Sequence, residues 1–519
     1  MPGYLLAIDA GTGSGRAVLF DTFGDQLAAA SEEWSHSSDP RVPGSMAFEC
    51  EQNWALLSRC VKACLEQAGA NPSDVLGVSA TSMREGIVLL DAQGTELWAC
   101  ANVDARAGEQ VRELSREHPN LEREMYTRSG QTFALAALPR LLWVQRNLPE
   151  VYAATRSLMM LSDWVLYRLS GEIAADPSNA STSGIFDNAT RTWAPDLARQ
   201  LGLKDDIFPR VLEPGSLMGQ VHARAARETG LNLGTKVVMG GGDAQLGCVG
   251  LAVVRAGQAA VLGGSFWQQE VNLPAAVSDP SMNVRVNCHA VPGLWQAEAI
   301  VFYAGLTMRW FRDAFCQPEQ QLAAARGVDT YTVLEELAAK VPVGSHGIMP
   351  VFSDVIRYSS WYHAGPSLLN LNLDPGRCGK PEIFRALQEN AAIVTAGNLE
   401  RIYEFSGVDP ESLVFAGGAA KGPLWCQILA DATGKPLRIP VVKEATALGT
   451  ALAAGVGVGE YSNMLEAAQV VKFEREVTPI LENVRTYREL RERWAQAYAA
   501  QRQLVDDGIT TSLWKAPGL

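Results

Sequence analysis

The chain opens on short apolar runs separated by glycine-rich turns. Residues 4–8 form an apolar run of the kind that a fully buried strand requires, and residues 17–20 form a second one directly after a short glycine link. Such a pair predicts a hairpin. Residues 26–34 can supply another strand, the apolar positions of residues 50–69 recur at helical spacing, and residues 75–81 are apolar again. This order predicts an α/β protein with a mixed sheet rather than a plain βαβ repeat.

The same pattern starts again near residue 237. Residues 236–243 run from an apolar strand through three glycines to an acid, and residues 261–266 supply a second turn of glycines and a hydroxyl. Residues 413–420 form a further strand that ends in glycines, and the small residues of 444–455 predict a closely packed helix between domains. A chain of 519 residues exceeds what one core usually supports. We therefore expect two domains, residues 1–245 and 246–519, facing one cleft.

Composition excludes several classes of function. A net charge of −13 argues against nucleic acid or an anionic membrane as the main partner. The cysteines are odd in number without a Cys-x-x-Cys pair, and the histidines have no metal-ligand spacing, so neither a disulfide framework nor a zinc site is indicated. No basic leader and no apolar run of membrane length is present, which predicts a soluble, cytoplasmic protein.

The first glycine turn is a candidate phosphate site. Gly11, Gly13 and Gly15 let backbone N–H groups approach a ligand closely, and Thr12 and Ser14 add hydroxyl donors. Asp9 precedes them at the end of a strand, where a carboxylate suits a divalent cation. The pattern is neither the Walker loop nor the dinucleotide fingerprint. A simple glycine hairpin with a capping aspartate is the alternative.

Polar residues follow two further strands of the first half. Arg84 and Glu85 come directly after the strand at 75–81, and Asn102 and Asp104 come after a second hairpin at 87–98. Ligands favour the carboxyl ends of strands in open sheets, and these groups could bind a polyol there. A solvated charged turn is the alternative.

Asp243 stands where a general base would have to lie, opposite the first glycine turn. Its ordinary pKa near 4 leaves it ionised at neutral pH and able to accept a proton. The glycines at 417–418 could support a flat nucleobase, although a tight strand-to-helix turn explains them equally well.

Taken together, these segments resemble the FGGY family of carbohydrate kinases over nearly the whole chain. Residues 9–16 and 262–266 look like its two phosphate motifs, residues 240–243 like the segment with its catalytic aspartate, and residues 415–419 like its adenosine motif. The resemblance implies two ribonuclease H/actin-like ATPase domains around a catalytic cleft. It also implies transfer of the ATP γ-phosphate to a sugar or polyol hydroxyl, with Mg²⁺.

The resemblance assigns a role to each matching position. Asp243 would be the catalytic base, and Asp9 and Asp243 would face the metal. The substrate would be held by Arg84, Glu85, Asn102, Asp104, Asp243, Gln245 and Phe266. ATP would be held by Gly11, Thr12, Gly13, Ser14, Arg16, Gly263, Gly264, Ser265, Gly417, Gly418 and Ala419.

Departures from the family pattern bear on the substrate. Arg140 stands where the family usually has lysine, Asn102 replaces a common aromatic residue, and the apolar residues 133–135 replace a polar group. The pocket should therefore suit a smaller or less hydroxylated carbonyl compound than glycerol kinase takes.

One branch of the family matches residues 82–87, 100–106, 307–315 and 510–519 best. It phosphorylates the terminal C5 hydroxyl of linear 4,5-dihydroxy-2,3-pentanedione, a quorum-sensing signal. A xylulose- or ribulose-type pentulose kinase and a catalytically silent sugar sensor are the alternatives. This branch works beside the sugar phosphotransferase system, so a phosphocarrier protein is a conceivable partner, as is a second copy in a homodimer.

Overall fold

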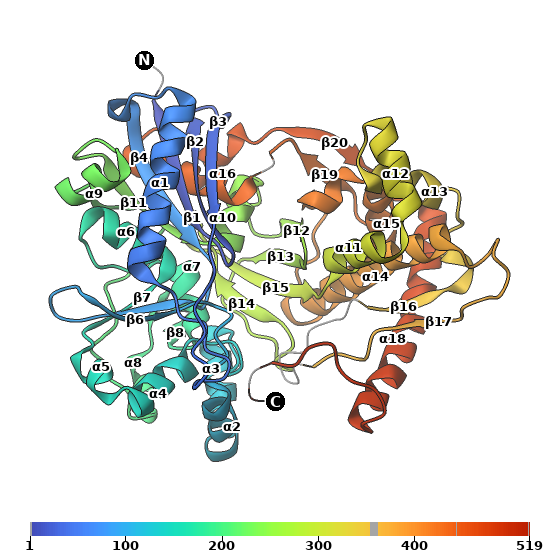
Figure 1. Cartoon of the computed structure of the whole chain (residues 1–519). Helices are drawn as coiled ribbons and strands as arrows, with labels where there is room; N and C mark the ends of the chain where they lie inside the picture. The colour runs from blue at the N-terminus through green and yellow to red at the C-terminus, as the bar shows by residue number, and fades with distance from the viewer. Residues whose placement is uncertain (1–2, 353–361, 443, 517, 519) are drawn as a thin grey trace.

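The computed structural model describes residues 3–352, 362–442, 444–516 and 518, which form two lobes side by side (Figure 1). A six-stranded sheet lies in the first lobe in the order β10-β11-β4-β1-β2-β3. Its strands are β1 (Tyr4–Ala10), β2 (Ser14–Asp21), β3 (Gln26–Glu33), β4 (Val75–Ser82), β10 (Leu217–Gln220) and β11 (Lys236–Gly242). β1 pairs antiparallel with β2 and parallel with β4, so the predicted hairpin and mixed sheet are confirmed.

A seven-stranded sheet in the order β14-β15-β13-β12-β18-β19-β20 extends from the junction of the lobes into the second lobe (Figure 1). Its strands are β12 (Ala259–Gly263), β13 (Trp267–Leu273), β14 (Arg285–Cys288), β15 (Trp295–Val301), β18 (Leu413–Ala416), β19 (Leu437–Pro440) and β20 (Phe473–Val477). The smaller sheets contain β5 (Ile87–Leu90), β6 (Glu96–Cys100) and β7 (Ser157–Met160); β8 (Phe186–Asp187) and β9 (Thr192–Trp193); and β16 (Met349–Val351) and β17 (Ser367–Leu369).

Helices cover both sheets. Those of the first half are α1 (Cys50–Ala68), α2 (Gly108–Glu117), α3 (Leu121–Ser129), α4 (Leu138–Asn147), α5 (Pro149–Ala154), α6 (Leu161–Ser170), α7 (Pro177–Ala180), α8 (Pro195–Gln200), α9 (Ala223–Thr229) and α10 (Asp243–Gly250). Those of the second half are α11 (Ala304–Phe315), α12 (Gln317–Arg326), α13 (Thr330–Ala338), α14 (Lys380–Ser406), α15 (Pro423–Thr433), α16 (Ala445–Val458), α17 (Met464–Ala467) and α18 (Leu481–Asp506). Short 3-10 turns are η1 (Pro72–Asp74), η2 (Ser181–Ser183), η3 (Ser345–Gly347), η4 (Gly418–Lys421) and η5 (Ala468–Val470).

Strand β1 is buried on both faces, which explains its unbroken apolar run. Successive strand side chains point to opposite faces. Leu5 and Ala7 accordingly pack in a cluster with residues of α16, whereas Leu6 and Ile8 pack in a cluster with residues of α1. The first lobe is therefore a three-layer sandwich, and the end of β1 is held between two packed layers.

Helices α10 and α16 pack backbone to backbone. A Cβ added to Gly250 would lie 1.9 Å from the Ala445 carbonyl oxygen, and one added to Gly449 would lie 1.8 Å from the Leu246 carbonyl oxygen. The close packing predicted for the small residues of 444–455 is confirmed.

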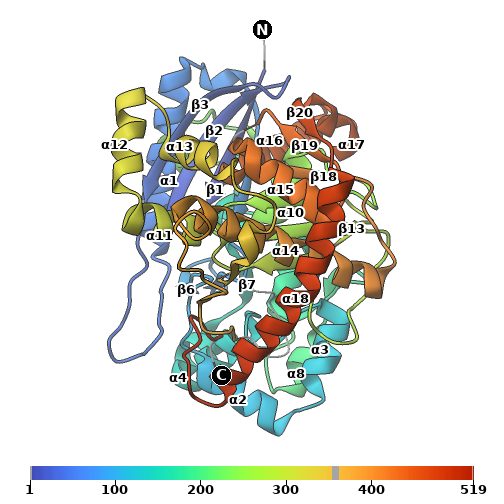
Figure 2. The same ribbon diagram turned by 90° about the vertical axis from the view of Figure 1, so that its right-hand side faces the viewer.

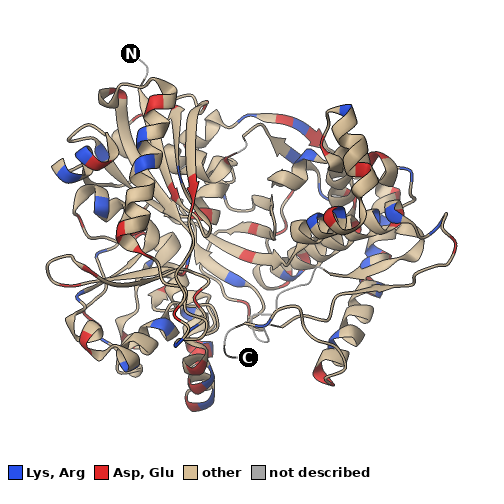
Figure 3. Ribbon diagram, viewed as in Figure 1, with Lys and Arg blue, Asp and Glu red and all other residues tan. Residues whose placement is uncertain are grey.

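The long helix α18 runs diagonally along one side of the molecule (Figure 2). Its residues Tyr487, Trp494 and Tyr498 are buried in the core of the second lobe, as their helical spacing predicts. Acidic and basic residues are interspersed along the elements of both lobes (Figure 3). Within the described ranges, no helix has the length and apolar character needed to cross a membrane.

Candidate active site

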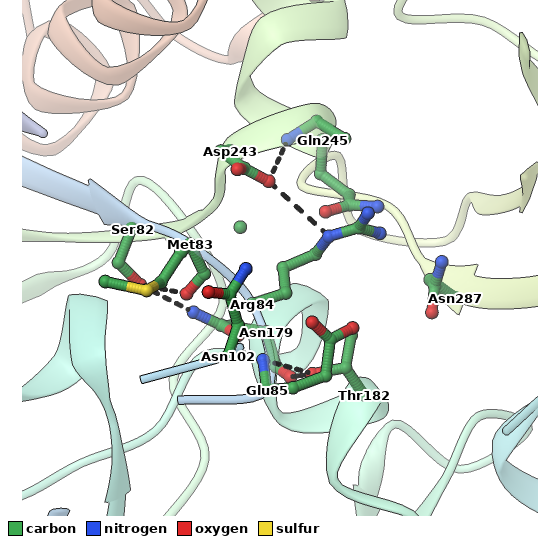
Figure 4. A network of polar contacts seen from close by, with 12 residues as sticks. Ser82, Met83, Arg84, Glu85, Asn102, Asn179, Thr182, Asp243, Gln245 and Asn287 are labelled. Carbon is green, nitrogen blue, oxygen red and sulfur yellow. Dashed lines mark hydrogen bonds and ion pairs between the residues drawn. The ribbon is translucent and has the colours of Figure 1, made fainter. Parts of the chain in front are cut away.

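The structure brings Asp243 and Arg84 together at the carboxyl ends of two parallel strands. β11 pairs with β4 so that Gly242 lies opposite Ser82, and Asp243 and Arg84 follow these two residues. Arg84 Nε lies 3.4 Å from Asp243 Oδ1. Figure 4 shows the two side chains facing each other. The predicted proximity of these two segments follows from this strand register.

Asp243 is the first residue of α10, where its carboxylate meets the positive end of the helix. Its Oδ1 also accepts the Ala244 backbone N–H at 2.7 Å. The side chain keeps 42% of its surface exposed, yet the surrounding protein removes enough water to raise the pKa of the carboxyl above its usual range. Arg84 opposes that rise. An acid in this setting can take up a proton more readily than an ordinary aspartate.

Asp9 is the second acid at this end of the sheet. Burial raises its pKa to about 7; Arg16 lowers it, and the negative charges of Asp243 and Glu444 raise it further. Arg16 Nε lies 3.2 Å from Asp9, and Arg16 Nη1 lies 2.6 Å from Glu444. An acid whose pKa is raised by a second acid is in a setting that a cation would relieve.

The number of carboxylates at this end of the sheet, Asp9 and Asp243, is compatible with a Mg²⁺ site. Among the described residues, no group of three or more His, Cys, Asp and Glu side chains is placed to enclose a metal ion. Mg²⁺ is usually held by one or two carboxylates together with water and substrate phosphates rather than by a complete protein cage. Asp9 and Asp243 supply that number of protein ligands.

Arg84 and Glu85 are held by residues from the second half of the chain. Arg84 makes a two-pronged ion pair with Glu298 of β15, with Nη2 to Oε1 at 3.0 Å as one contact. Arg285 of β14 lies 2.5 Å from Glu85 Oε1. Glu85 has φ 62, a left-handed conformation that is uncommon for this residue type and typical of functional turns. Glu298 and Arg285 were not among the residues predicted for the site.

Arg140 fixes the backbone of the predicted substrate segments. Its guanidinium donates to three carbonyl oxygens: Glu85 at 2.6 Å, Asn102 at 2.7 Å and Asp104 at 3.0 Å. A planar fork of donors can join three chain segments, which the single ammonium of a lysine does less well. The departure from lysine at this position therefore has a structural reason.

Asn102 and Asp104 lie in different settings. Asn102 donates from Nδ2 to the Thr12 hydroxyl at 3.2 Å, which joins the predicted substrate segment to the first glycine turn. The Asp104 side chain is fully buried, and its carboxylate accepts hydrogen bonds from the Arg106 guanidinium and from the Met46 backbone N–H. Its predicted contact with substrate stays a prediction; the contact observed is structural.

Gln245 lies behind Asp243. It is fully buried and donates to Gln296 Oε1 of β15 at 2.9 Å. Phe266 is 41% exposed at the end of the β12–β13 turn, with its ring packed against Phe302 and Tyr303. The predicted substrate contacts of these two residues also stay predictions.

The loop at residues 176–181 supports Asp243. Asp176 caps α7 as expected and also accepts the Ser178 hydroxyl at 2.5 Å. Ser178 Oγ in turn accepts the Gly242 N–H at 2.9 Å, immediately before Asp243. Asn179 donates to Ser82 Oγ at 3.0 Å (Figure 4). The loop thus braces both strand ends that carry the candidate site.

Most of the residues predicted to hold ATP lie at three turns, whereas Ser14 and Arg16 belong to strand β2, where Arg16 pairs with Asp9 and Glu444. Gly11, Thr12 and Gly13 connect β1 to β2, which begins at Ser14, and the Gly11 N–H donates to the Ser14 carbonyl at 3.0 Å. Gly263, Gly264 and Ser265 connect β12 to β13, while Gly417, Gly418 and Ala419 follow β18.

Two of these turns touch. β12 and β18 are parallel neighbours, and a Cβ at Gly417, where φ is 97, would lie 2.7 Å from the Gly263 carbonyl oxygen. The predicted second phosphate turn and the predicted adenosine turn thus form one continuous surface of backbone. Only glycine fits at Gly417, both by conformation and by space.

Comparison with protein families gives the class of this molecule. Residues 4–250 match the N-terminal domain and residues 270–458 the C-terminal domain of the FGGY family of carbohydrate kinases. The chain belongs to this family, and the predicted family and α/β fold class are confirmed. Membership of a kinase family implies ATP as the phosphate donor.

Individual relatives are closer still. The chain is 57% identical to the autoinducer-2 kinase of Yersinia enterocolitica over 99% of this chain and 98% of the relative. It is 54% identical to the autoinducer-2 kinase of Salmonella paratyphi B over the same shares.

Solved structures support the fold. A xylulose kinase from Rhodospirillum rubrum has a TM-score of 0.86 at 24% identity and covers 96% of this chain and 99% of its own. A Plasmodium falciparum glycerol kinase with ADP has a TM-score of 0.82 at 18% identity and covers 96% of this chain and 98% of its own.

Proposed function

We propose that this protein is an autoinducer-2 kinase, which transfers the γ-phosphate of ATP to the C5 hydroxyl of linear 4,5-dihydroxy-2,3-pentanedione. The observation that carries the substrate is the 57% identity to autoinducer-2 kinases across nearly the full length of both chains. Xylulose and glycerol kinases share the fold at no more than 24% identity, and a shared fold does not specify a substrate.

The arrangement around Asp243 supports phosphoryl transfer. Such transfer depends on positioning and charge stabilisation more than on covalent chemistry by the protein. In our proposal Asp243 accepts the proton of the attacking hydroxyl, and Arg84 and Glu85 orient the acceptor. The turns at 11–14 and 263–265 bind the phosphates, and the turn at 417–419 supports the adenosine.

Asp9 and Asp243 would hold Mg²⁺, which would supply positive charge beside the phosphates. Arg16, which pairs with Asp9 and Glu444, would keep Asp9 oriented. We also propose that the division of the chain into domains falls near residue 245. A phosphocarrier protein of the sugar phosphotransferase system and a second copy of the chain are proposed partners that follow from the family branch alone.

The test is ATP consumption with the pentanedione, xylulose, ribulose and glycerol as separate acceptors, with product mass measured in the same samples. A strong preference for the pentanedione, with a product heavier by one phosphoryl group, is the expected result. Preference for a pentulose would overturn the substrate and keep the family. ATP binding without transfer to any acceptor would instead favour a sensor.

A further inference from the structure

Three neighbouring strands carry a buried polar face at the junction of the two lobes. The strand register places Arg285 of β14 opposite Glu298 of β15, and Glu298 opposite Glu270 of β13. A second row two residues along each strand consists of Asn287, Gln296 and Asn272. All six side chains are almost completely removed from water, with Arg285 the most exposed at 2%. Burying this many polar groups is unfavourable unless they are paired, so their pairing needs an explanation.

Two residues of the first row pair with Arg84 and Glu85, the residues proposed to orient the phosphate acceptor. Glu298 binds both terminal nitrogens of Arg84, and Arg285 binds Glu85. Arg285 also lies 3.5 Å from Glu298, so the four residues form one connected group of two cations and two anions. Residues of the second half therefore decide how Arg84 and Glu85 point.

Glu298 also competes with Asp243 for Arg84. Because Glu298 holds the two Nη groups, only Nε approaches Asp243, at the long distance of 3.4 Å. Without Glu298, a two-pronged Arg84–Asp243 pair would be the next available arrangement, and it would occupy the oxygens that must accept a proton. The observed geometry leaves Asp243 accessible.

Resting on the proposed function, we infer that Glu298 is a positioning residue for phosphoryl transfer: it turns the Nη groups of Arg84 away from Asp243 and, with Arg285, orients Arg84 and Glu85 toward the acceptor. Glu298 contributes no atom to the reaction. Its effect is exerted through Arg84.

Glu270 provides a matched control within the same row. Burial and the neighbouring Glu298 raise the pKa of Glu270 well above its usual range, while Arg84 and Arg285 hold the pKa of Glu298 low. The surroundings thus favour the neutral form of Glu270 and the anion of Glu298. A glutamine can replace a neutral carboxyl with little electrostatic change, but it cannot replace the anion that holds Arg84.

The experiment compares Glu298→Gln with Glu270→Gln, using the acceptor that the wild-type protein phosphorylates best. We expect Glu298→Gln to lower kcat/KM for the acceptor by about 10- to 100-fold, with a raised KM for the acceptor and an unchanged KM for ATP. Glu270→Gln should stay within about threefold of wild type on both substrates. Thermal unfolding of both variants confirms that the compared samples are folded.

A purely structural role would give a different result. If Glu298→Gln only lowered the folded fraction, the KM values for both substrates would stay at wild-type values. That result, or equal losses in the two variants, would overturn the inference. If Glu298→Gln does not fold, Arg285→Lys is the second test. This variant keeps the positive charge and loses the planar, forked donor geometry of the guanidinium. It should raise the KM for the acceptor and leave the KM for ATP unchanged.

The inference and the proposed substrate can fail separately. A wild-type preference for a pentulose would reject the pentanedione, and the comparison of variants with that pentulose would still test Glu298.

Discussion

Gly250 of α10 and Gly449 of α16 meet where their helices cross, so that each occupies the space in which the other would carry a side chain. A Cβ on Gly250 would lie 2.8 Å from the Gly449 nitrogen, and one on Gly449 would lie 2.9 Å from the Gly250 nitrogen. Because α10 begins at Asp243, this crossing fixes the helix that carries the candidate base.

We therefore expect Gly449→Ala to be destabilising. The methyl group would meet backbone atoms, which cannot rotate away, and forced overpacking usually lowers the free energy of unfolding by about 1–3 kcal/mol. Urea denaturation measures this change. Gly397→Ala in α14 is the matched control, because nothing lies within 4 Å of its added Cβ. The control should be neutral or stabilising by up to about 1 kcal/mol, and equal losses in the two variants would contradict the argument.

Asp243→Asn should abolish most turnover without unfolding the protein. The amide keeps the shape of the side chain but cannot accept the hydroxyl proton, and loss of a general base lowers kcat by about 10²- to 10⁴-fold. Asp205→Asn serves as a control on the surface, since Asp205 is exposed and pairs with the exposed Arg199. An Asp243→Asn enzyme with full turnover would exclude Asp243 as the base.

Arg140→Lys should loosen the chain segments proposed to bind the acceptor while keeping the positive charge. The lysine cannot reach the Glu85, Asn102 and Asp104 carbonyls together, and each buried carbonyl left without a donor costs about 1–3 kcal/mol. The expected result is a lower unfolding free energy and a higher acceptor KM with an unchanged KM for ATP. Steady-state kinetics on both substrates checks this, and a rise confined to the ATP KM would show that the segments are held in another way.

His289 should make the fold sensitive to acid. Burial, aided by Arg191, lowers the pKa of this fully buried side chain to about 3. Below the ordinary histidine pKa of about 6.5, the unfolded chain binds a proton at this histidine and the folded chain does not. The free energy of unfolding therefore falls as the pH drops from about 6.5 toward 3. The loss attributable to this residue is about 1 kcal/mol between pH 6.5 and 5.5.

His289→Asn tests this contribution, because Asn can still accept the Val291 N–H that the His289 ring accepts at 2.9 Å. Denaturant titrations at the two pH values should show a shallower pH dependence in the variant than in the parent. Identical slopes would mean that other groups account for the acid sensitivity.

Much of the fold follows from local patterns in the sequence. The β1–β2 hairpin, the helix at residues 50–68 and the hairpin at 87–100 each have a continuous period or a turn signal, and each is found where it is predicted. The family resemblance assigned Arg84 and Asp243 to one substrate site, whereas the pairing of their strands in one sheet is a finding of the structure. Assignment of individual residues to acceptor, phosphate and adenosine stays a prediction.

Glu298 and Arg285 could not be placed in the same way. Their partners depend on the register of β14, β15 and β13 and on how those strands pack against the first half, and neither is encoded in a local period. A signal was present nonetheless: polar residues alternate at 285 and 287 and at 296 and 298 within segments that are otherwise apolar. Alternating polar residues on a fully buried strand indicate a partner from elsewhere in the chain.

The pairing of Arg84 with Glu298 has a consequence for synthesis of the protein. The two residues are separated by 214 positions, so Arg84 is synthesised long before Glu298 is available to hold it. This long-range pair can form only after β15 has been translated, and the acceptor-binding side of the site reaches its final arrangement no earlier.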